Sequence, residues 1–387
     1  MKIALVLTND WELFGDGSGS YYEVQHKPLA ELLPLLSAYD AKITLMAEVM
    51  QQFSHQSIAA ENPEAKEISN SWENIIRDAA VRGHDVQLHL HPQWQGAKYT
   101  GSKWQCDMDK WKLSAHSPET IEMMIKRGKE YLEQLIAPVN PDYKCIAFRA
   151  GGYGIQPEKE IIGILKRNGF VADTSVSKGL YSQEMYDFRE APSNIIPWHT
   201  TPENLCRTGS PNEGLLELPI YSVKKFHSLL MKKYAPGLYY SHAFDTDATA
   251  GELNWMKERD KIKSVRYPVA NRFYKKTGKK GIKFYLKAFL AENVFQLDYD
   301  YLPASAFLKT LEGILQDENL AKYTAKGITI PVVASGHVKD MHNTKNIELI
   351  LKGVKKNFAN DIAYQTLSEA ITNWQKITEN NNNQEIR

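Results

Sequence analysis

The 387-residue sequence has few cysteines, no excess of either charge and no long apolar run. Its three cysteines, Cys106, Cys145 and Cys206, are odd in number and far apart, which argues against a disulfide framework or a cysteine-rich metal site. A formal net charge of +1 gives no electrostatic reason to expect nucleic acid or an anionic membrane as a partner. No segment approaches the roughly 20 apolar residues that a membrane-spanning helix requires, so we expect no membrane span.

Two kinds of sequence motif are also missing. Residues 1–10, MKIALVLTND, lack the apolar length and the small-residue cleavage site of a secretory signal peptide. Together with the scarcity of cysteine, this predicts a cytoplasmic protein. No GxGxxG follows the first apolar run, and neither GxxxxGKS nor GxxxxGKT occurs. Open parallel sheets commonly bind phosphate groups with these motifs, so their absence favours a closed barrel over an open sheet.

Short apolar runs are the main structural signal that is present. They are typical of strands buried on both faces, and segments with helical periodicity separate many of them. This alternation predicts an α/β fold with a parallel sheet. The runs are residues 2–8, 42–49, 84–91, 145–151, 215–222 and 327–336.

The chain is expected to form a single catalytic domain over residues 1–387. Its core is predicted at about 1–222 and 325–360. Residues 224–297 are rich in lysine and aromatic residues and have few strand signals, which predicts a mostly helical insertion packed on that core. The low-complexity tail, about 378–387, is expected to fray.

Polar residues stand at the carboxyl ends of several predicted strands. In a barrel these ends meet at one rim, which is where catalytic groups gather. Residues two apart on a strand also point to the same side, which pairs the residues at 10 and 12 and those at 89 and 91. The side chains brought to the rim in this way are Asp10, Glu12, His89, His91, Arg149 and His337.

A divalent cation is the simplest partner for such a group of buried charges, which would otherwise be costly. Two histidines and one of these carboxylates form a hydrolytic metal site for Zn²⁺ or a similar ion. A second carboxylate takes a proton from water, and a further histidine protonates the leaving group. Either Asp10 or Glu12 can be the metal carboxylate, and either His91 or His84 can join His89.

The same residues carry a resemblance to a known family. The segments LTNDWE, GHDVQLHLHP, FRAGGYG, DTSV and SGH, in this order, resemble the motifs of the polysaccharide deacetylases, the NodB-homology carbohydrate esterases. The His-x-His-Pro spacing of the second motif resembles a divergent subgroup. The resemblance implies a distorted (β/α) barrel of about seven parallel strands and a metal-dependent removal of N-acetyl groups from carbohydrates.

The resemblance also implies roles for individual residues. By this likeness Asp10 is the catalytic base and Glu12 is the metal carboxylate. His89 and His91 are the metal-binding histidines.

Three further roles follow from the same likeness. Arg149 orients the base, Asp173 lines the cleft and His337 is the catalytic acid. The chain departs from the family pattern at Trp11, where a second aspartate is usual, and at Gln93, where the second histidine is usual.

Aromatic residues and a glycine-rich turn are expected to contact the substrate. Aromatic rings pack against the apolar faces of sugars, and glycines allow a ligand to approach the backbone. Trp104 and Trp111 are further candidates for a sugar-stacking wall. The residues predicted to bind substrate are Trp11, Trp94, Gly151, Gly152, Tyr153 and Trp198.

The sequence therefore predicts a metal-dependent carbohydrate N-deacetylase that acts in making or modifying a surface polysaccharide. Three alternatives stay open. The first is a hydrolase of another non-peptide C–N bond, in a ureide or a cyclic amide. The second is a glycan-binding barrel without catalysis, and the third is a glycoside hydrolase with paired carboxylates.

Overall fold

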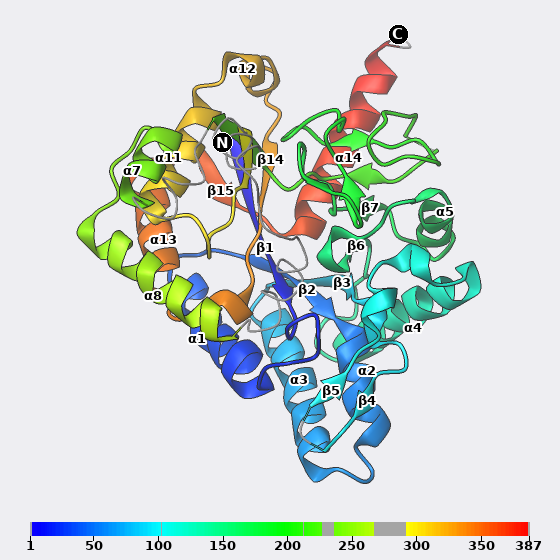
Figure 1. The fold of residues 1–387 in the computed structure, drawn as a ribbon. Coiled ribbons are helices and arrows are strands. Elements are labelled where there is room, and N and C mark those ends of the chain that lie inside the picture. The colour runs from blue at the N-terminus through cyan, green and yellow to red at the C-terminus, as the bar shows by residue number, and fades with distance from the viewer. Residues whose placement is uncertain (1, 102, 212, 227–235, 267–291, 386–387) are drawn as a thin grey trace, which may run out of the picture.

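A nine-stranded, mostly parallel sheet forms the centre of the computed structural model, which describes all residues except 1, 102, 212, 227–235, 267–291 and 386–387 (Figure 1). The strand order is β10-β11-β7-β6-β3-β2-β1-β14, and β15 pairs with β1. All neighbours are parallel except β10 and β11. The strands are β1 (Ile3–Trp11), β2 (Ile43–Glu48), β3 (Asp85–Leu90), β6 (Ala147–Ala150), β7 (Ala172–Asp173), β10 (Trp198–His199), β11 (Leu216–Glu217), β14 (Ile330–Ala334) and β15 (Ile362–Tyr364).

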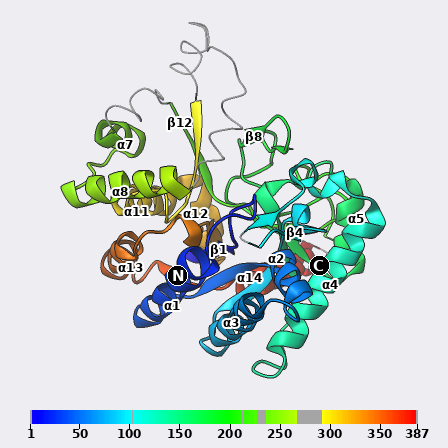
Figure 2. The ribbon, with the colours of Figure 1, turned by 60° about the horizontal axis from the view of Figure 1, so that its bottom comes forward.

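Helices cover the outside of the sheet (Figure 1, Figure 2). Every residue of β1, β2, β3, β6 and β14 is buried, as expected for parallel strands that are covered on both faces. Side-chain caps begin several helices; Ser117, for example, accepts a hydrogen bond from the Thr120 backbone at the start of α4. The helices are α1 (Lys27–Ala38), α2 (Val49–Ile58), α3 (Pro63–Val81), α4 (Pro118–Ile136), α5 (Lys159–Arg167), α11 (Ala304–Leu315), α12 (Glu318–Thr324), α13 (Lys345–Asn357) and α14 (Leu367–Glu385).

The sheet curls until its two ends meet. A parallel bridge joins Ile220, three residues after β11, to Val333 of β14, and the Tyr221 backbone N–H donates to the Val333 carbonyl at 2.9 Å. The carboxyl ends of β1, β3, β6 and β14 therefore face a common space. The predicted α/β class with a curled, mostly parallel sheet is confirmed, although the sheet has nine strands where about seven were expected.

Residues 224–297 contain both helices and strands in their described part. The strands β12 (Ser222–Phe226) and β13 (Glu292–Gln296) form a two-stranded antiparallel sheet, accompanied by the helices α7 (Pro236–Phe244) and α8 (Ala250–Arg266). Phe295 of β13 packs edge-to-face against Phe244 of α7 at a ring separation of 5.3 Å. The lysine-rich segment 275–283 lies outside the described residues.

Two further expectations concern the C-terminal tail and membrane-spanning helices. The tail predicted to fray from about residue 378 continues α14 as far as Glu385. No helix in the part of the chain that the structure describes is long and apolar enough to cross a membrane.

Candidate metal centre

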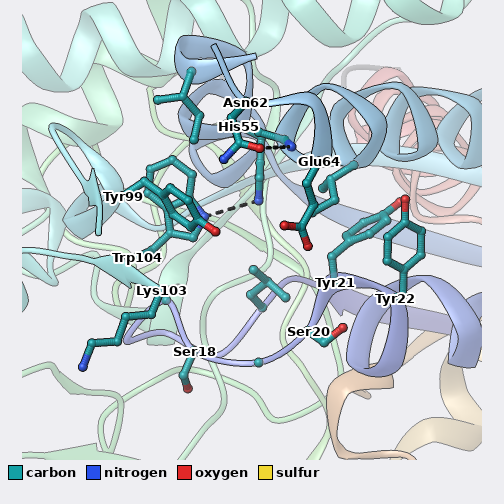
Figure 3. Close-up of a pocket in the computed structure, with 16 residues that line it drawn as sticks. Ser18, Ser20, Tyr21, Tyr22, His55, Asn62, Glu64, Tyr99, Lys103 and Trp104 are labelled. Atoms are coloured by element: carbon teal, nitrogen blue, oxygen red, sulfur yellow. Dashed lines mark hydrogen bonds between the residues drawn. The ribbon is translucent and has the colours of Figure 1, made fainter. Parts of the chain in front are cut away.

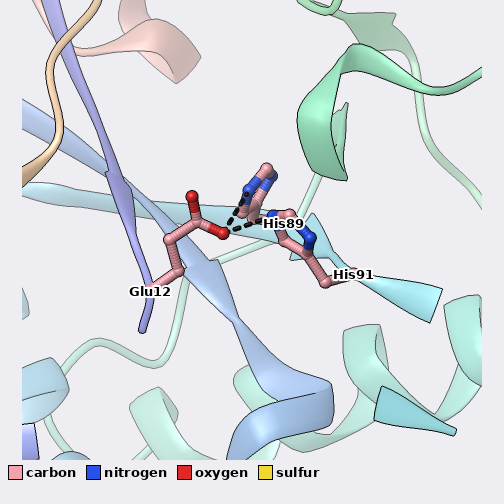
Figure 4. A group of neighbouring side chains, drawn as sticks. All are labelled: Glu12, His89 and His91. Carbon is pink, nitrogen blue, oxygen red and sulfur yellow. Dashed lines mark ion pairs between the residues drawn. The ribbon is translucent and has the colours of Figure 1, made fainter. Parts of the chain in front are cut away.

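Glu12, His89 and His91 meet at the carboxyl ends of β1 and β3 (Figure 4). Glu12 Oε2 lies 3.4 Å from His89 Nε2 and is in direct contact with His91 Nε2. One donor atom from each residue lies within 4.8 Å of the other two. All three side chains are at most 5% exposed, so the cluster is closed to bulk water.

Hydrogen bonds fix the orientation of both imidazole rings. His89 Nδ1 lies 3.0 Å from the Arg149 carbonyl oxygen, so this nitrogen carries the proton and donates, and the lone pair of Nε2 faces Glu12. His91 Nδ1 lies 2.8 Å from the side-chain amide of Gln93, which also donates to the Gly15 carbonyl at 2.9 Å. A protonated Nδ1 held by a carbonyl oxygen, as in His89, is how proteins aim Nε2 at a metal.

The three facing atoms have no other partner. Glu12 Oε2, His89 Nε2 and His91 Nε2 are buried and make no hydrogen bond. Buried polar atoms without partners are rare and costly in proteins. Two imidazole nitrogens and one carboxylate oxygen form a common ligand set for a divalent cation such as Zn²⁺ that leaves further coordination positions open. The residues present therefore fit a bound metal ion.

An Asp-Arg-His group lies beside this cluster. Arg149 Nη1 donates to Asp10 Oδ1 at 2.6 Å, and His337 Nε2 lies 3.3 Å from Asp10 Oδ2. The Arg149 side chain is fully buried, and its Nε donates to the Thr174 carbonyl. The two carboxylate oxygens of Asp10 are thus held by different cations.

These contacts shift the pKa values of both titrating groups. Burial alone would raise the pKa of Asp10, but the charge of Arg149 and the hydrogen bond to His337 hold it well below its usual range. Burial alone would lower the pKa of His337, but the hydrogen bond and charge of Asp10 raise it above its usual value. Asp10 is therefore ionised and His337 favours its protonated form.

Asp173 lies behind Arg149 and forms a carboxyl pair with Glu217. The two residues are register partners on β7 and β11, and their buried carboxyl groups repel each other when both are ionised. Burial raises the pKa of Asp173 to about 6 and that of Glu217 well above its usual value. The pair therefore shares a proton near neutral pH.

The sequence analysis missed four residues around the centre. The Lys339 ammonium contacts Glu12 Oε1. Asp298 Oδ2 lies 4.0 Å from His337 Nδ1, and Asp300 Oδ2 accepts the His337 backbone N–H at 2.5 Å. Glu48 ends β2 directly beside His89, and burial raises its pKa well above its usual value. Their only sequence signal is proximity to strand ends, as in SGHVKD (residues 335–340).

Three tryptophans predicted to bind substrate are buried elsewhere, which corrects those predictions. Trp11 is fully buried on the opposite side of β1 from its neighbours, with its ring 5.1 Å from that of Trp72. Trp94 is 2% exposed. Trp198 is 6% exposed and donates its indole N–H to the Leu205 carbonyl. No ring face of these residues is open to a sugar.

His84 is also misplaced as an alternative ligand. It precedes Asp85, the first residue of β3, and so lies at the amino end of this strand. His89 and His91 lie at the opposite end, which leaves His91 as the second histidine of the cluster.

The glycine-rich turn makes room for protein side chains rather than for a ligand. A Cβ on Gly151 would lie 2.6 Å from the His91 ring, and one on Gly152, which has φ of +55°, would lie 2.9 Å from Trp111 Nε1. Tyr153 stays a candidate for substrate contact, because its hydroxyl interacts electrostatically with Asp10 and Arg149.

Trp111 stands at the edge of the centre. Its ring is partly exposed and lies 6.4 Å from that of His91. Its buried indole N–H makes no hydrogen bond. Of the tryptophans considered for a sugar-stacking wall, Trp111 therefore has the most suitable position.

A pocket of about 380 Å³ is lined in part by the segment that follows Glu12, including Leu13 and Gly17 (Figure 3). In this segment the Gly15 carbonyl accepts from Gln93, and Gly17 packs against Trp104. Trp104 donates its indole N–H to His55 Nε2. Aromatic and polar side chains both line the pocket, among them Ser18, Tyr21, Tyr22, Asn62, Glu64, Tyr99, Lys103 and Trp104.

The sequence matches no family model and no curated protein. Several solved structures have a similar chain course. A protein described as a polysaccharide deacetylase from Mycobacterium smegmatis has 12% identity and a TM-score of 0.45 over 99% of this chain and 91% of its own. Another so described, from Pseudomonas aeruginosa PAO1, has 9% identity and a TM-score of 0.45 over 97% and 91%. A GH57-type branching enzyme from Thermococcus kodakaraensis has 10% identity and a TM-score of 0.48 over 96% and 71%. Similarities with TM-scores below 0.5 carry no argument about family or activity.

Proposed function

We propose that this protein is a metal-dependent hydrolase that removes an N-acetyl group from a carbohydrate. The observation that carries the proposal is the pair of adjacent clusters at the strand ends. Glu12, His89 and His91 present three buried, unpartnered ligand atoms to one another. Asp10 and His337, a base and an acid in suitable protonation states, lie next to them.

The residues of the chain divide the reaction among them. Glu12, His89 and His91 would hold the divalent cation, proposed to be Zn²⁺, which would supply Lewis-acid chemistry. Asp10 accepts a proton from the attacking water, and Arg149 keeps Asp10 ionised and in place. The C–N bond of the amide breaks, and His337 gives its proton to the departing amine. Acetate and a free amino sugar are the products.

The carbohydrate part of the proposal rests on the surroundings of the centre. Trp111 offers a partly exposed aromatic ring close to His91. The pocket lined by the segment after Glu12 combines aromatic rings with hydroxyl, amide and carboxylate groups, the mixture that binds the apolar faces and hydroxyls of sugars. Tyr153 completes the proposed set of substrate contacts.

The order of the strand-end residues supports a wider assignment. We propose that residues 1–387 form one catalytic domain of a divergent polysaccharide deacetylase with a NodB-type barrel. The three cysteines form no disulfide, which agrees with a cytoplasmic location and with a role in making surface polysaccharide or its precursors.

Acetate release from a panel of N-acetylated mono- and oligosaccharides tests the proposal. We expect zinc-dependent release by the wild type and a loss of at least about 100-fold in Asp10→Asn, because the base is removed. His84→Gln is the matched control, since it alters a buried histidine at the other end of β3 and should keep full activity.

The same assay separates the alternatives. If ureides release ammonia or cyclic amides are opened, and no sugar releases acetate, the substrate is of another class. The proposed metal chemistry would still hold. Glycan binding without turnover by a zinc-loaded protein would contradict the hydrolase proposal. Sugar hydrolysis that survives removal of the metal would indicate a glycoside hydrolase.

A further inference from the structure

Lys339 contacts one carboxylate oxygen of Glu12 and leaves the other oxygen facing the two histidines. It belongs to the short 3-10 turn Val338–Asp340, two residues after His337. Its ammonium contacts Glu12 Oε1, whereas Glu12 Oε2 faces the Nε2 atoms of His89 and His91. The Lys339 side chain is 10% exposed and the Glu12 side chain 5%, so this contact is shielded from solvent.

The turn that carries Lys339 is itself anchored. Asp340 Oδ2 accepts a hydrogen bond from Lys263 of α8 at 2.9 Å, which connects the turn to the 224–297 segment. His337, which directly precedes the turn, donates its backbone N–H to the Asp300 carboxylate. Lys339 is therefore held against Glu12 by structure on both sides of it.

Both carboxylates of the centre have cationic partners without a metal ion. Asp10 pairs with Arg149 and His337, and Glu12 pairs with Lys339. A divalent cation at Glu12 Oε2 would share one carboxylate with the Lys339 ammonium, and like charges repel strongly where water is excluded. Without the cation, Lys339 prevents Glu12 from being an uncompensated buried charge.

We propose that Lys339 is a positioning residue that occupies Glu12 Oε1, leaves only Oε2 for the metal ion, and lowers the affinity of the centre for that ion. This inference rests on the metal centre of the proposed function. Its consequence is an ion that is bound through one carboxylate oxygen and exchanges readily. The lysine also keeps the metal-free protein stable.

Zinc affinity measured by competition with a chromophoric chelator, at fixed pH and ionic strength, tests this inference. Lys339→Met and Lys339→Gln both remove the charge, and the glutamine can still donate to Glu12 Oε1. We expect both variants to bind Zn²⁺ more tightly than the wild type, on the order of tenfold or more. Lys339→Arg keeps the charge and should bind with wild-type affinity.

Lys352→Met is the matched control. It removes the same charge from an exposed ion pair with Glu348 within α13 and does not touch Glu12. Its zinc affinity should stay within about twofold of the wild-type value, because an exposed charge is well screened.

Two further readouts distinguish positioning from a general structural role. The midpoint temperature of thermal unfolding should be lower in metal-free Lys339→Met than in the metal-free wild type. Added zinc should raise this temperature more in the variant than in the wild type. With Co²⁺ as the probe, release of Oε1 in this variant should raise the coordination number and weaken the visible absorption band.

The outcomes are separable from those of the proposed function. Equal or weaker zinc binding by both neutral variants, an unchanged Co²⁺ spectrum, or a wild type that binds no divalent metal would each overturn the inference. If the affinity differences appear but no acetate is released from any sugar, the role of Lys339 stands and the proposed activity fails. If Lys339→Met does not fold, Lys339→Gln decides the question.

Discussion

The residues of the candidate centre are sensitive to the loss of any one neighbour because they are buried charges. His89 and Arg149 are fully buried, and Asp10, Glu12 and His91 are at most 4% exposed. In such surroundings, removing one partner of an ion pair leaves a charge that neither water nor protein compensates. Exposed ion pairs elsewhere in the chain lack this property.

Arg149→Met tests this difference. The change removes the cation at Asp10 Oδ1, which should raise the pKa of Asp10 and lower the free energy of unfolding by about 3–5 kcal/mol. Acetate release should fall by at least about 100-fold. Urea denaturation and the acetate assay measure the two effects.

Arg189→Met is the control. Arg189 also forms a two-pronged pair with a carboxylate, Asp187, but its side chain is 56% exposed. We expect a loss of no more than about 1 kcal/mol and normal activity. Equal losses in both variants would contradict the account.

Gly151→Ala tests the space that His91 occupies. The Gly151 backbone lies outside the left-handed region, so an added methyl acts only through its 2.6 Å contact with the His91 ring. We expect the ring to shift and zinc affinity to fall by about tenfold or more. Chelator competition measures the change.

Gly313→Ala is the corresponding control. Gly313 lies within α11, and a methyl there meets nothing within 4 Å. It should leave zinc affinity unchanged and add about 0.5–1 kcal/mol to stability through helix propensity. Unchanged zinc affinity in both glycine variants would show that Gly151 does not set the position of His91.

For single residues, the sequence predicted which side of a strand a side chain faces better than it predicted the contacts of that side chain. Alternation along a strand correctly brings Glu12 and the two histidines together. The same alternation sends Trp11 to the opposite side, which explains why its prediction was wrong. Lys339 was beyond prediction, because its contact depends on how the turn after β14 folds back over β1.

The individual strands explain a second group of results. The predicted runs at 2–8, 42–49 and 84–91 correspond to β1, β2 and β3, since continuous apolar runs are typical of parallel strands. The run at 215–222 spans two elements instead, β11 and the start of β12. Strand β7 has two residues, too few for a periodic signal, and no strand was predicted there.

The β7–β11 pairing predicts a pH dependence of stability. The pKa of Asp173 is raised to about 6 from its ordinary 3.8, and that of Glu217 is raised further by burial and by Asp173. The folded state therefore binds protons more tightly than the unfolded chain. Its stability contribution from this pair is full below about pH 4 and declines as the pH rises through about 6.

Glu217→Gln should remove much of this decline. With one carboxyl gone, the part of the decline that comes from the raised pKa of Glu217 disappears, while burial still keeps the pKa of Asp173 raised. We expect the difference in the free energy of unfolding, variant minus wild type, to rise by about 1–2 kcal/mol as the pH goes from roughly 4 to 7. Urea denaturation across this range measures it, with the exposed Glu61→Gln as a control that should show no such trend. A pH-independent difference for Glu217→Gln would rule out the shared proton.

At the scale of the whole molecule, one tyrosine links the segment after β13 to β1. Tyr299, which follows β13, is 1% exposed; its hydroxyl donates to the Thr8 carbonyl at 3.0 Å and accepts from Asn9 Nδ2 at 2.8 Å. Asn9 directly precedes Asp10 on β1. The segment after the 224–297 insertion thus supports the strand that carries both carboxylates.

Tyr299→Phe should therefore destabilise the fold. Loss of the hydroxyl leaves a buried carbonyl and a buried amide without this partner, at a cost of about 1–3 kcal/mol. Tyr181→Phe, at a residue 53% exposed, should change stability by less than about 0.5 kcal/mol. Urea denaturation compares them, and similar values for both would show that Tyr299 does not brace β1.

The closed course of the sheet was predictable in outline only. The alternation of apolar runs and helical segments indicated a barrel-like α/β fold. The single bridge between Ile220 and Val333 that joins its ends has no sequence signal, because it depends on the accumulated twist and curl of the intervening strands. Strand β14 pairs directly with β1, and this pairing brings His337 next to Asp10.

The central claim is that a divalent cation binds between Glu12, His89 and His91. A crystal grown with excess zinc and measured on both sides of the zinc absorption edge tests it most directly. The account predicts an anomalous peak at roughly 2.0–2.2 Å from Glu12 Oε2, His89 Nε2 and His91 Nε2. A map with no peak there, and with the three side chains turned away from one another, would contradict it.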